Sequence, residues 1–359
     1  MYLQDIQLYN FKNFDEKSFQ FDQKINCFVG NNGVGKTNVL DAIHFLAFGK
    51  SYFNNNIKQI LRFNELAFSV KGLFDINQKS ESILLSYQID KKKQLKRNNK
   101  LYSRFSDHIG LIPLVMISPY DRDLISESGE TRRRFVDKII SQFDAAYFSA
   151  LIAYQKNLAQ RNSLLKYFAA NHRFDSDTLA VYNEQLHRFG TVIYQKRQMF
   201  IAEFSTLLKQ RYMELSGDKE KVEISYFSSL EVRPLLDLLN KNIQKDRVLQ
   251  HTSKGIHRDD FSFEINGKPI KKFGSQGQQK SFLIALRLAE FEFLKRQSDK
   301  MPILLFDDIF DKLDESRVAQ IIKMVNDSRF GQIFISDTHA ERTKNLVENI
   351  HQSYKIFEL

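Results

Sequence analysis

The sequence has no tryptophan, a single cysteine and only five prolines among its 359 residues. Because Cys27 is alone, no intrachain disulfide can form, which favours a reducing compartment. The longest apolar run, residues 111–117, is far shorter than the ~20 residues that a membrane-spanning helix needs. Residues 1–5 show neither the basic nor the apolar part of an export signal. We therefore expect a soluble, cytoplasmic protein with no membrane partner.

The composition is that of a globular chain with a basic surplus. Hydrophobic residues make up 42% of it and charged residues 27%, which is enough apolar material to bury real cores. Phenylalanine, with 32 copies, must supply most of the aromatic packing. Lysine and arginine outnumber the acids by 53 to 43, giving a net charge of +10. That surplus favours polyanionic partners, nucleic acid before anionic membrane, although solubility alone also explains it.

Strand and helix patterns at both ends of the chain flank a mostly helical middle. We expect an α/β lobe made of residues 1–119 together with 250–359, and a mostly helical inserted lobe over residues 120–249. The basic, polar segment 89–101 reads as a loop, and Asn266-Gly267 as a hairpin turn. Expected strands lie at residues 25–29, 67–74, 83–88, 111–117, 222–227, 261–265, 303–306, 332–336 and 354–357, and expected helices at 276–296 and 315–326.

A phosphate-binding loop follows the strand at residues 25–29 and opens a helix. The segment fits G-x-x-x-x-G-K-[ST] at every fixed position. Its backbone N–H groups can surround phosphates, Lys36 can reach the β- and γ-phosphates, and the Thr37 hydroxyl can ligate Mg²⁺. We expect ATP and Mg²⁺ as cofactors, with nucleotide contacts from Gly30, Asn31, Asn32, Gly33, Val34, Gly35, Lys36 and Thr37.

Two acids, Asp307 and Asp308, end the apolar strand at residues 303–306. Such a pair alone is more often a solvated turn or a helix cap. Together with the phosphate loop, the first acid suits the magnesium site and the second suits activation of the attacking water. We therefore expect Asp307 as a metal ligand with Thr37, and Asp308 as a catalytic residue with Lys36.

The segment Ser275-Gln276-Gly277-Gln278-Gln279 stands at the start of an expected helix. Ser275 and Gln278 have capping-box spacing, which is a sufficient structural reason for both. A helix start that contains glycine also offers free N–H groups and a hydroxyl to an anion. We expect Ser275, Gly277 and Gln278 to contact nucleotide as well.

The order of phosphate loop, insert, Ser-Gln-Gly-Gln-Gln segment and two-acid strand resembles the ATP-binding cassette plan. In that family the serine segment of one subunit meets the γ-phosphate held by the other, which implies a dimer around two ATP molecules. Leu313-Asp314 resembles the loop after the second acid. The γ-phosphate switch position lies among Asp337, Thr338 and His339, and the choice between them stays open.

Over essentially the whole chain the sequence resembles the RecF family of bacterial recombination-mediator ATPases, which have an SMC-type head without the long coiled coil. The resembling segments are 10–14 (N-F-K-N-F), Pro119 with 132–137 (R-R-R-F-V-D), 255–260 (G-I-H-R-D-D) and 273–288. Departures from the family pattern are Lys12 for Arg, Ile256 for Pro, Gly129-Glu130-Thr131 for a Gly-x-Pro turn, and residues 311–314 (D-K-L-D) for S-E-L-D.

The resemblance implies binding of single-stranded, gapped or junction DNA, slow ATP hydrolysis, and help for RecA loading with RecO and RecR. Basic segments that could contact DNA are Lys91–Lys93 with Lys96 and Arg97, and Lys271-Lys272, although such a segment, taken singly, is more often a solvated loop than a DNA contact. Three alternatives remain. They are an ATP-gated DNA clamp with negligible turnover, a Rad50 or SMC relative, and the ATPase subunit of a transporter.

Overall fold

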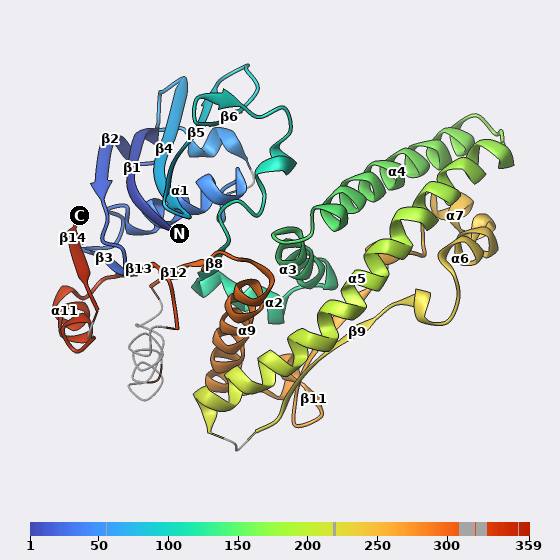
Figure 1. The fold of residues 1–359 in the computed structure, drawn as a ribbon. Helices are drawn as coiled ribbons and strands as arrows, with labels where there is room; N and C mark the ends of the chain where they lie inside the picture. The colour runs from blue at the N-terminus through green and yellow to red at the C-terminus, as the bar shows by residue number, and fades with distance from the viewer. Residues whose placement is uncertain (55, 218–219, 309–319, 321–328, 351) are drawn as a thin grey trace. The chain divides into compact units, whose positions relative to one another are not determined.

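The computed structural model describes residues 1–54, 56–217, 220–308, 320, 329–350 and 352–359. The chain forms two compact units (Figure 1), which we call the sheet unit, residues 1–121 and 283–359, and the helical unit, residues 122–282. The second boundary falls after residue 282, later than the expected 249. The reason is that strand β10 (Asp260–Ile265) pairs along its whole length with β9 (Val222–Phe227), which keeps residues 250–282 with the insert.

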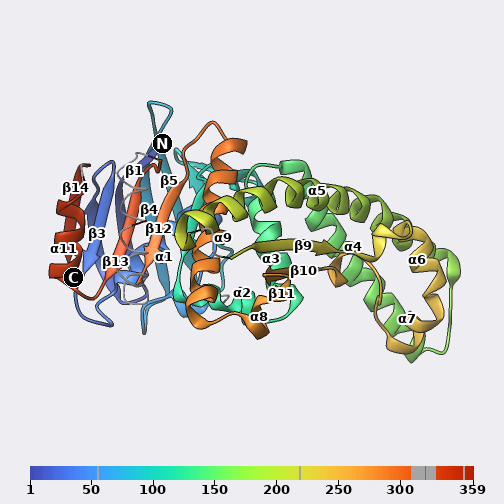
Figure 2. The same ribbon diagram turned by 90° about the horizontal axis from the view of Figure 1, so that it is seen from below.

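The sheet unit contains an antiparallel and a parallel sheet. The antiparallel sheet has the order β2-β1-β4-β5-β6-β7, and the parallel sheet has the order β14-β3-β13-β12-β8. Figure 2 shows β14, β3, β13 and β12 of the parallel sheet. The strands of the first are β1 Tyr2–Phe11, β2 Phe14–Gln20, β4 Ala67–Ile76, β5 Lys79–Gln88, β6 Gln94–Arg97 and β7 Lys100–Leu101. Those of the second are β3 Ile25–Val29, β8 Leu114–Ile117, β12 Ile303–Asp307, β13 Ile333–Asp337 and β14 Tyr354–Glu358.

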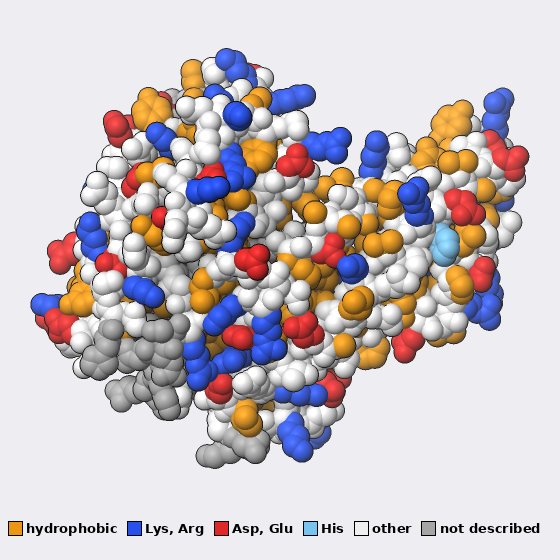
Figure 3. Space-filling model, viewed as in Figure 1, with side chains coloured by type: hydrophobic (Ala, Val, Ile, Leu, Met, Phe, Trp, Pro, Cys, Tyr) orange, Lys and Arg blue, Asp and Glu red, His pale blue; other side chains and the backbone are white. Residues whose placement is uncertain are grey.

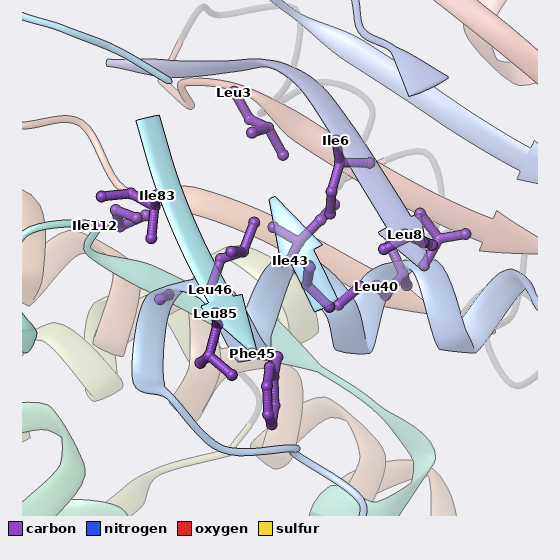
Figure 4. Packing of buried hydrophobic residues seen from close by; sticks show 14 of the residues in the cluster. Leu3, Ile6, Leu8, Leu40, Ile43, Phe45, Leu46, Ile83, Leu85 and Ile112 are labelled. Atoms are coloured by element: carbon purple, nitrogen blue, oxygen red, sulfur yellow. The ribbon is translucent and has the colours of Figure 1, made fainter. Parts of the chain in front are cut away.

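Helix α1 (Lys36–Phe48) packs against strands of both sheets and forms the centre of the core. Figure 4 shows its Leu40, Ile43 and Leu46 among apolar side chains of β1, β5 and the segment before β8. Each of these side chains is fully buried, which contributes about 1.5–3 kcal/mol per residue. A second helix, α11 (Ala340–Glu348), lies against β3, and three short 3₁₀ helices occupy Ile57–Ile60, Phe105–His108 and Pro119–Arg122.

Phenylalanine fills the space between β2, β3, β13 and β14, as the absence of tryptophan predicts. Phe21 lies edge-on to Phe28 and Phe334, while Phe28 stacks on Phe357 with ring centroids 5.2 Å apart. Such contacts stabilise by about 0.5–1.5 kcal/mol beyond the apolar area that they bury. The cluster joins the strand that leads into the phosphate loop to both of its neighbours in the sheet.

The prediction of a loop over residues 89–101 is wrong, because this segment contains the hairpin β6–β7. Leu95 is buried opposite Leu85, and Asn98 and Asn99 take φ values of 48° and 66° in the turn. Two consecutive positive φ values define the tight turn that fits a twisted hairpin, and asparagine tolerates them. The other expected strands are present, although β8 begins only at Leu114, and α11 had no expected counterpart. The expected helix 315–326, apart from residue 320, lies outside the described residues.

The helical unit is built on two long helices, α4 (Ala145–Ala170) and α5 (Ser176–Ser216), which pack against each other. Gly190 of α5 allows the close approach, since a Cβ there would lie 2.5 Å from Leu235 and 3.1 Å from Tyr154. The remaining elements are α2 Asp123–Ser126, α3 Gly129–Ser141, η4 Ser229–Glu231, α6 Leu235–Lys241, α7 Ile243–Leu249, η5 Ile256–Arg258, β11 Lys268–Pro269 and α8 Ile270–Phe273. Helix α9, Gln276–Gln297, begins in this unit and ends in the sheet unit.

Arg197 of α5 is buried at the point where two family-like segments meet. Its guanidinium donates to both carboxylate oxygens of Asp137, at 2.9 and 3.0 Å, and to the carbonyl of Ile256 at 2.9 Å. It also lies 3.5 Å from the carboxylate of Asp259. Asp137 belongs to the R-R-R-F-V-D segment and Asp259 to G-I-H-R-D-D, so one buried cation holds the two together.

Arg132 and Arg133 also connect the R-R-R-F-V-D segment to the G-I-H-R-D-D segment. Arg132 donates two hydrogen bonds to the Asp260 carboxylate, at 3.0 and 2.9 Å, and Arg133 donates to the carbonyl of Asp259. Arg134 pairs with Glu130 on its own helix. These three arginines therefore have structural partners within the helical unit.

We predict that Arg197→Met lowers the free energy of unfolding by about 3–5 kcal/mol, because it leaves the buried Asp259 carboxylate and the partly buried Asp137 carboxylate without their cation. Arg188→Met, on the exposed side of the same helix, should change it by less than about 0.5 kcal/mol. Urea unfolding followed by circular dichroism measures both. Equal losses in the two variants would contradict a central role for Arg197.

Candidate nucleotide-binding site

The site lies at the carboxyl ends of three adjacent parallel strands. β3, β13 and β12 are in register, with Asp337 beside Val29 and Asp307 beside Ser336. All residues of the three strands are buried, so only the loops beyond them can meet a ligand. In open α/β sheets this edge is the usual place for ligand binding.

The phosphate loop at residues 30–37 connects β3 to α1, as predicted. Gly30 and Gly35 have φ values of 144° and 116°, which side chains other than glycine rarely adopt. A Cβ on Gly35 would also lie 2.7 Å from Asn13 and Phe14, and one on Gly30 would lie 2.6 Å from the carbonyl oxygen of Leu359. Both glycines are therefore required by the path of the backbone.

Lys36 bends back over the loop. Its Nζ donates to the carbonyls of Gly30 and Asn31 at 2.6 and 2.8 Å, and the residue is only 6% exposed. These bonds place the ammonium group above the loop formed by residues 30–35. A phosphate bound there would meet this charge and the field of the helix N-terminus together.

Thr37 and Asp307 meet across the sheet edge. Thr37 Oγ1 donates to Asp307 Oδ1 at 2.8 Å, although the two residues are 270 positions apart. Burial raises the pKa of Asp307, while the hydrogen bonds from Thr37 and Ser336 lower it and the nearby Asp308 charge raises it further. A hydroxyl and a buried carboxylate at the carboxyl end of a strand are the protein ligands of magnesium in phosphate-loop proteins.

The donor set fits Mg²⁺ held jointly with a nucleotide. Within the part of the chain that the structure describes, no group of three or more histidine, cysteine, aspartate or glutamate side chains could form a metal cage. Mg²⁺ commonly takes one or two protein ligands and completes its shell with phosphate oxygens and water. Thr37 and Asp307 would be those two ligands here.

Asp308 follows Asp307 in a left-handed backbone conformation, with φ 48°. Its N–H donates to Ser336 Oγ at 2.9 Å and to the Ser336 carbonyl at 3.2 Å. The turn places Asp308 at the same edge of the sheet as the phosphate loop. The D-K-L-D segment at residues 311–314, with the expected Leu313-Asp314 loop, lies outside the described residues.

Ser275, Gly277 and Gln278 lie at the start of α9 in the helical unit. The Ser275 N–H donates to Gln278 Oε1 at 2.6 Å, and the Gln278 N–H donates to Ser275 Oγ at 3.2 Å, so the capping box is formed. The Gln278 amide also donates to Glu220 at 2.6 Å. Ser275 is exposed, and its role toward nucleotide stays a prediction.

Asp337, one of the three candidates for the γ-phosphate switch, forms its side-chain hydrogen bonds with residues just after it in the chain. Its carboxylate accepts from the N–H of His339 at 3.1 Å, from the Arg342 guanidinium at 2.6 and 3.2 Å, and from the Thr343 hydroxyl at 2.7 Å. The residue is 1% exposed. These contacts give Asp337 a structural function at the start of α11.

Sequence reasoning missed Asn13, Asn38 and Ser336, three polar residues that support the site. Asn13 donates to the Val34 carbonyl at 2.9 Å and accepts from Asn38 at 2.7 Å, thereby holding the phosphate loop from outside. Ser336 bonds both acids at the end of β12. The N-F-K-N segment was a signal for Asn13, whereas a lone serine at the end of a strand gave none.

The basic clusters are less exposed than the sequence suggests. Lys93 donates to the Gly49 carbonyl and lies 4.5 Å from the centroid of the Phe105 ring, and burial lowers its pKa. Arg97 pairs with Glu81 through two hydrogen bonds of 2.8 and 2.6 Å. Lys91 and Lys92 are exposed, and Figure 3 shows basic side chains gathered where β5 and β6 lie.

Fold and site together define an ATPase head of the ATP-binding cassette type. Residues 2–358 match the family model described as the RecF/RecN/SMC N terminal domain. The chain is 59% identical to the DNA replication and repair protein RecF of Flavobacterium johnsoniae, over 100% of both chains. The chain belongs to the RecF family.

Two solved structures are similar to this chain, one at the level of the family and one at the level of the fold. One, described as the recombination mediator protein RecF-ATP in the RecFOR pathway, is 31% identical with a TM-score of 0.89, covering 94% of this chain and 92% of that one. An SMC head bound to the C-winged helix domain of ScpA is 16% identical with a TM-score of 0.57, covering 96% and 92%, and supports the fold alone. The expected α/β cassette head with a helical insert is confirmed. No helix within the described residues is long and apolar enough to cross a membrane.

We predict that Lys36→Met weakens nucleotide binding by about 100-fold or more, since charged contacts to two phosphates contribute about 1.5–3 kcal/mol each. Titration with a fluorescent ATP analogue measures the effect. Lys36→Arg, which keeps the charge in a planar shape, should recover only part of the affinity. Unchanged affinity in a folded Lys36→Met protein would rule out the phosphate-loop assignment.

Proposed function

We propose that this chain is an ATP-dependent, DNA-binding recombination mediator that dimerises around two Mg²⁺–ATP molecules. It acts with RecO and RecR to help RecA load at single-stranded gaps. The observation that carries the proposal is the joined site of Lys36, Thr37 and Asp307 at the edge of the parallel sheet. The relatives named RecF, one of them described with ATP in the RecFOR pathway, support the nucleotide and the biological setting.

Dimerisation is supported by the division of the motifs between the two units. The phosphate loop and both acids belong to the sheet unit, whereas Ser275 and Gly277 belong to the helical unit. Ser275 is exposed at a helix N-terminus, where it can offer a hydroxyl and backbone N–H groups to a phosphate on another molecule. In this arrangement each ATP is enclosed by the phosphate loop of one chain and the α9 start of its partner.

In the proposed catalytic cycle, Asp308 is the residue that activates water. It stands directly after the metal ligand Asp307, and its backbone is fixed to Ser336. Hydrolysis would open the dimer, and a slow rate would give the ATP-bound state a long life on DNA. A DNA clamp with negligible turnover is the alternative, and ATP turnover measured with and without gapped DNA separates the two.

We predict that Ser275→Arg chains bind ATP but do not dimerise, because the arginine occupies the position where the partner's γ-phosphate must dock. Mixing them with Lys36→Met chains should restore ATPase activity, since a mixed dimer retains one site with both Lys36 and Ser275 intact. Ser275→Ala provides a matched control. If Ser275 were only a cap, that change would cost about 1 kcal/mol of stability and affect dimerisation only through that loss.

No recovery in the mixture, with both proteins folded and mixed dimers detected by sizing, would mean that ATP is handled within one chain.

DNA binding is the second part of the proposal to test. We predict that Lys91→Gln and Lys92→Gln each reduce the slope of log affinity against log salt by ~1, because each removes a phosphate contact. Lys93→Gln should leave the slope unchanged, because the Lys93 ammonium is already bonded to Gly49. Fluorescence anisotropy of a gapped duplex at several salt concentrations measures the slopes. If the slopes of all three variants equal the wild-type slope, residues 91–93 form a solvated loop that does not contact DNA.

A further inference from the structure

Ser336 ends β13 and touches both acids that follow β12. In the parallel register Ser336 lies directly beside Asp307. Its Oγ donates to Asp307 Oδ1 at 2.8 Å and accepts from the N–H of Asp308 at 2.9 Å. The residue is 1% exposed, so water does not compete for these bonds.

The first of these bonds determines how the Asp307 carboxylate is presented. Asp307 Oδ1 accepts two hydroxyl hydrogens, one from Thr37 and one from Ser336, both at 2.8 Å. Thr37 is itself a proposed magnesium ligand, so its hydroxyl has a second task when the metal binds. Ser336 is not a proposed magnesium ligand, so it can hold the Asp307 carboxylate both with and without bound Mg²⁺.

The second bond fixes the backbone beyond the strand. Asp308 is in the left-handed region, where a residue with a side chain is disfavoured and needs support from its surroundings. The hydroxyl and the carbonyl of Ser336 both accept from the Asp308 N–H. The direction in which the chain leaves β12, and with it the place of the Asp308 side chain, therefore depends on Ser336.

We propose that Ser336 is a positioning residue that couples the metal ligand Asp307 to the residue proposed to activate water, Asp308. The inference rests on the proposed Mg²⁺–ATP function. A hydroxyl suits this position because it donates to one acid and accepts from the amide of the next. Alanine can do neither, and threonine keeps both capacities.

The competing explanation is that Ser336 only satisfies buried polar groups and stabilises the fold. That explanation predicts a lower melting temperature with no selective effect on magnesium. A positioning role predicts a selective effect, because residues that orient metal ligands commonly change metal affinity 10–100-fold.

The test compares Ser336→Ala and Ser336→Thr with the full-length wild-type chain. ATP-analogue binding is titrated in EDTA and over a range of Mg²⁺ concentrations, and turnover is measured over a range of ATP concentrations. Ser336→Ala should bind nucleotide as the wild type does in EDTA but need about 10-fold more Mg²⁺ for half-saturation. Its kcat should fall by about 10-fold with little change in KM, and Ser336→Thr should restore both within about 3-fold.

Ser141→Ala, a buried serine of α3 in the helical unit, controls for the loss of a buried hydroxyl and should leave the Mg²⁺ titration unchanged. Should Ser336→Ala fail to fold, Ser336→Cys, with its weak donor and acceptor, replaces it and should show an intermediate Mg²⁺ requirement.

Wild-type Mg²⁺ dependence in both Ser336→Ala and Ser336→Thr would overturn the role of Ser336 and leave the ATPase proposal standing. A wild-type chain whose nucleotide binding and turnover ignore Mg²⁺ would overturn both. A threonine variant no better than alanine would also overturn the coupling, since the hydroxyl would then be without effect.

Discussion

The hydrogen bond between Thr37 and Asp307 depends on one constraint, the parallel alignment of β3, β13 and β12. Parallel strands bring their carboxyl ends to the same edge, so segments 270 positions apart can form one site. The intervening chain is free to form the whole helical unit and return, provided that β12 rejoins the sheet beside β13. The phenylalanine cluster around Phe28 and the burial of α1 maintain that alignment.

Burial gives the sheet edge its chemistry. Because burial raises the pKa of Asp307, its ionised form is penalised in the fold at any pH above the ordinary aspartate pKa of about 3.9. The hydroxyls of Thr37 and Ser336 offset part of this penalty. A divalent cation would offset more, because it would place two positive charges directly at the carboxylate. The same desolvation that destabilises the carboxylate therefore favours magnesium.

Short-range patterns predicted the elements that build the site, and long-range packing determined the rest. The phosphate loop could be predicted from the sequence because glycine, lysine and threonine occur at fixed spacing between a strand and a helix. Arg197 was less readable, although it stands in the apolar stripe of α5 between Ile193 and Phe200, both buried. Its partners lie in two distant segments, residues 132–137 and 255–260, which no local sequence pattern could predict. The hairpin at residues 94–101 was missed because its turn is Asn98-Asn99 and one buried residue, Leu95, carries the pairing.

At the start of α9, the observed capping box is compatible with the proposed contact to nucleotide. Ser275 and Gln278 satisfy each other as a capping box, and Glu220 fixes the Gln278 amide. The cap explains these two residues without any ligand. It does not explain Gly277, which lies between them in the first turn and weakens the helix relative to alanine by up to about 1 kcal/mol. A glycine at a capped helix start is useful where a ligand must approach the backbone closely. That residue, more than the serine, favours a phosphate-binding role for the segment.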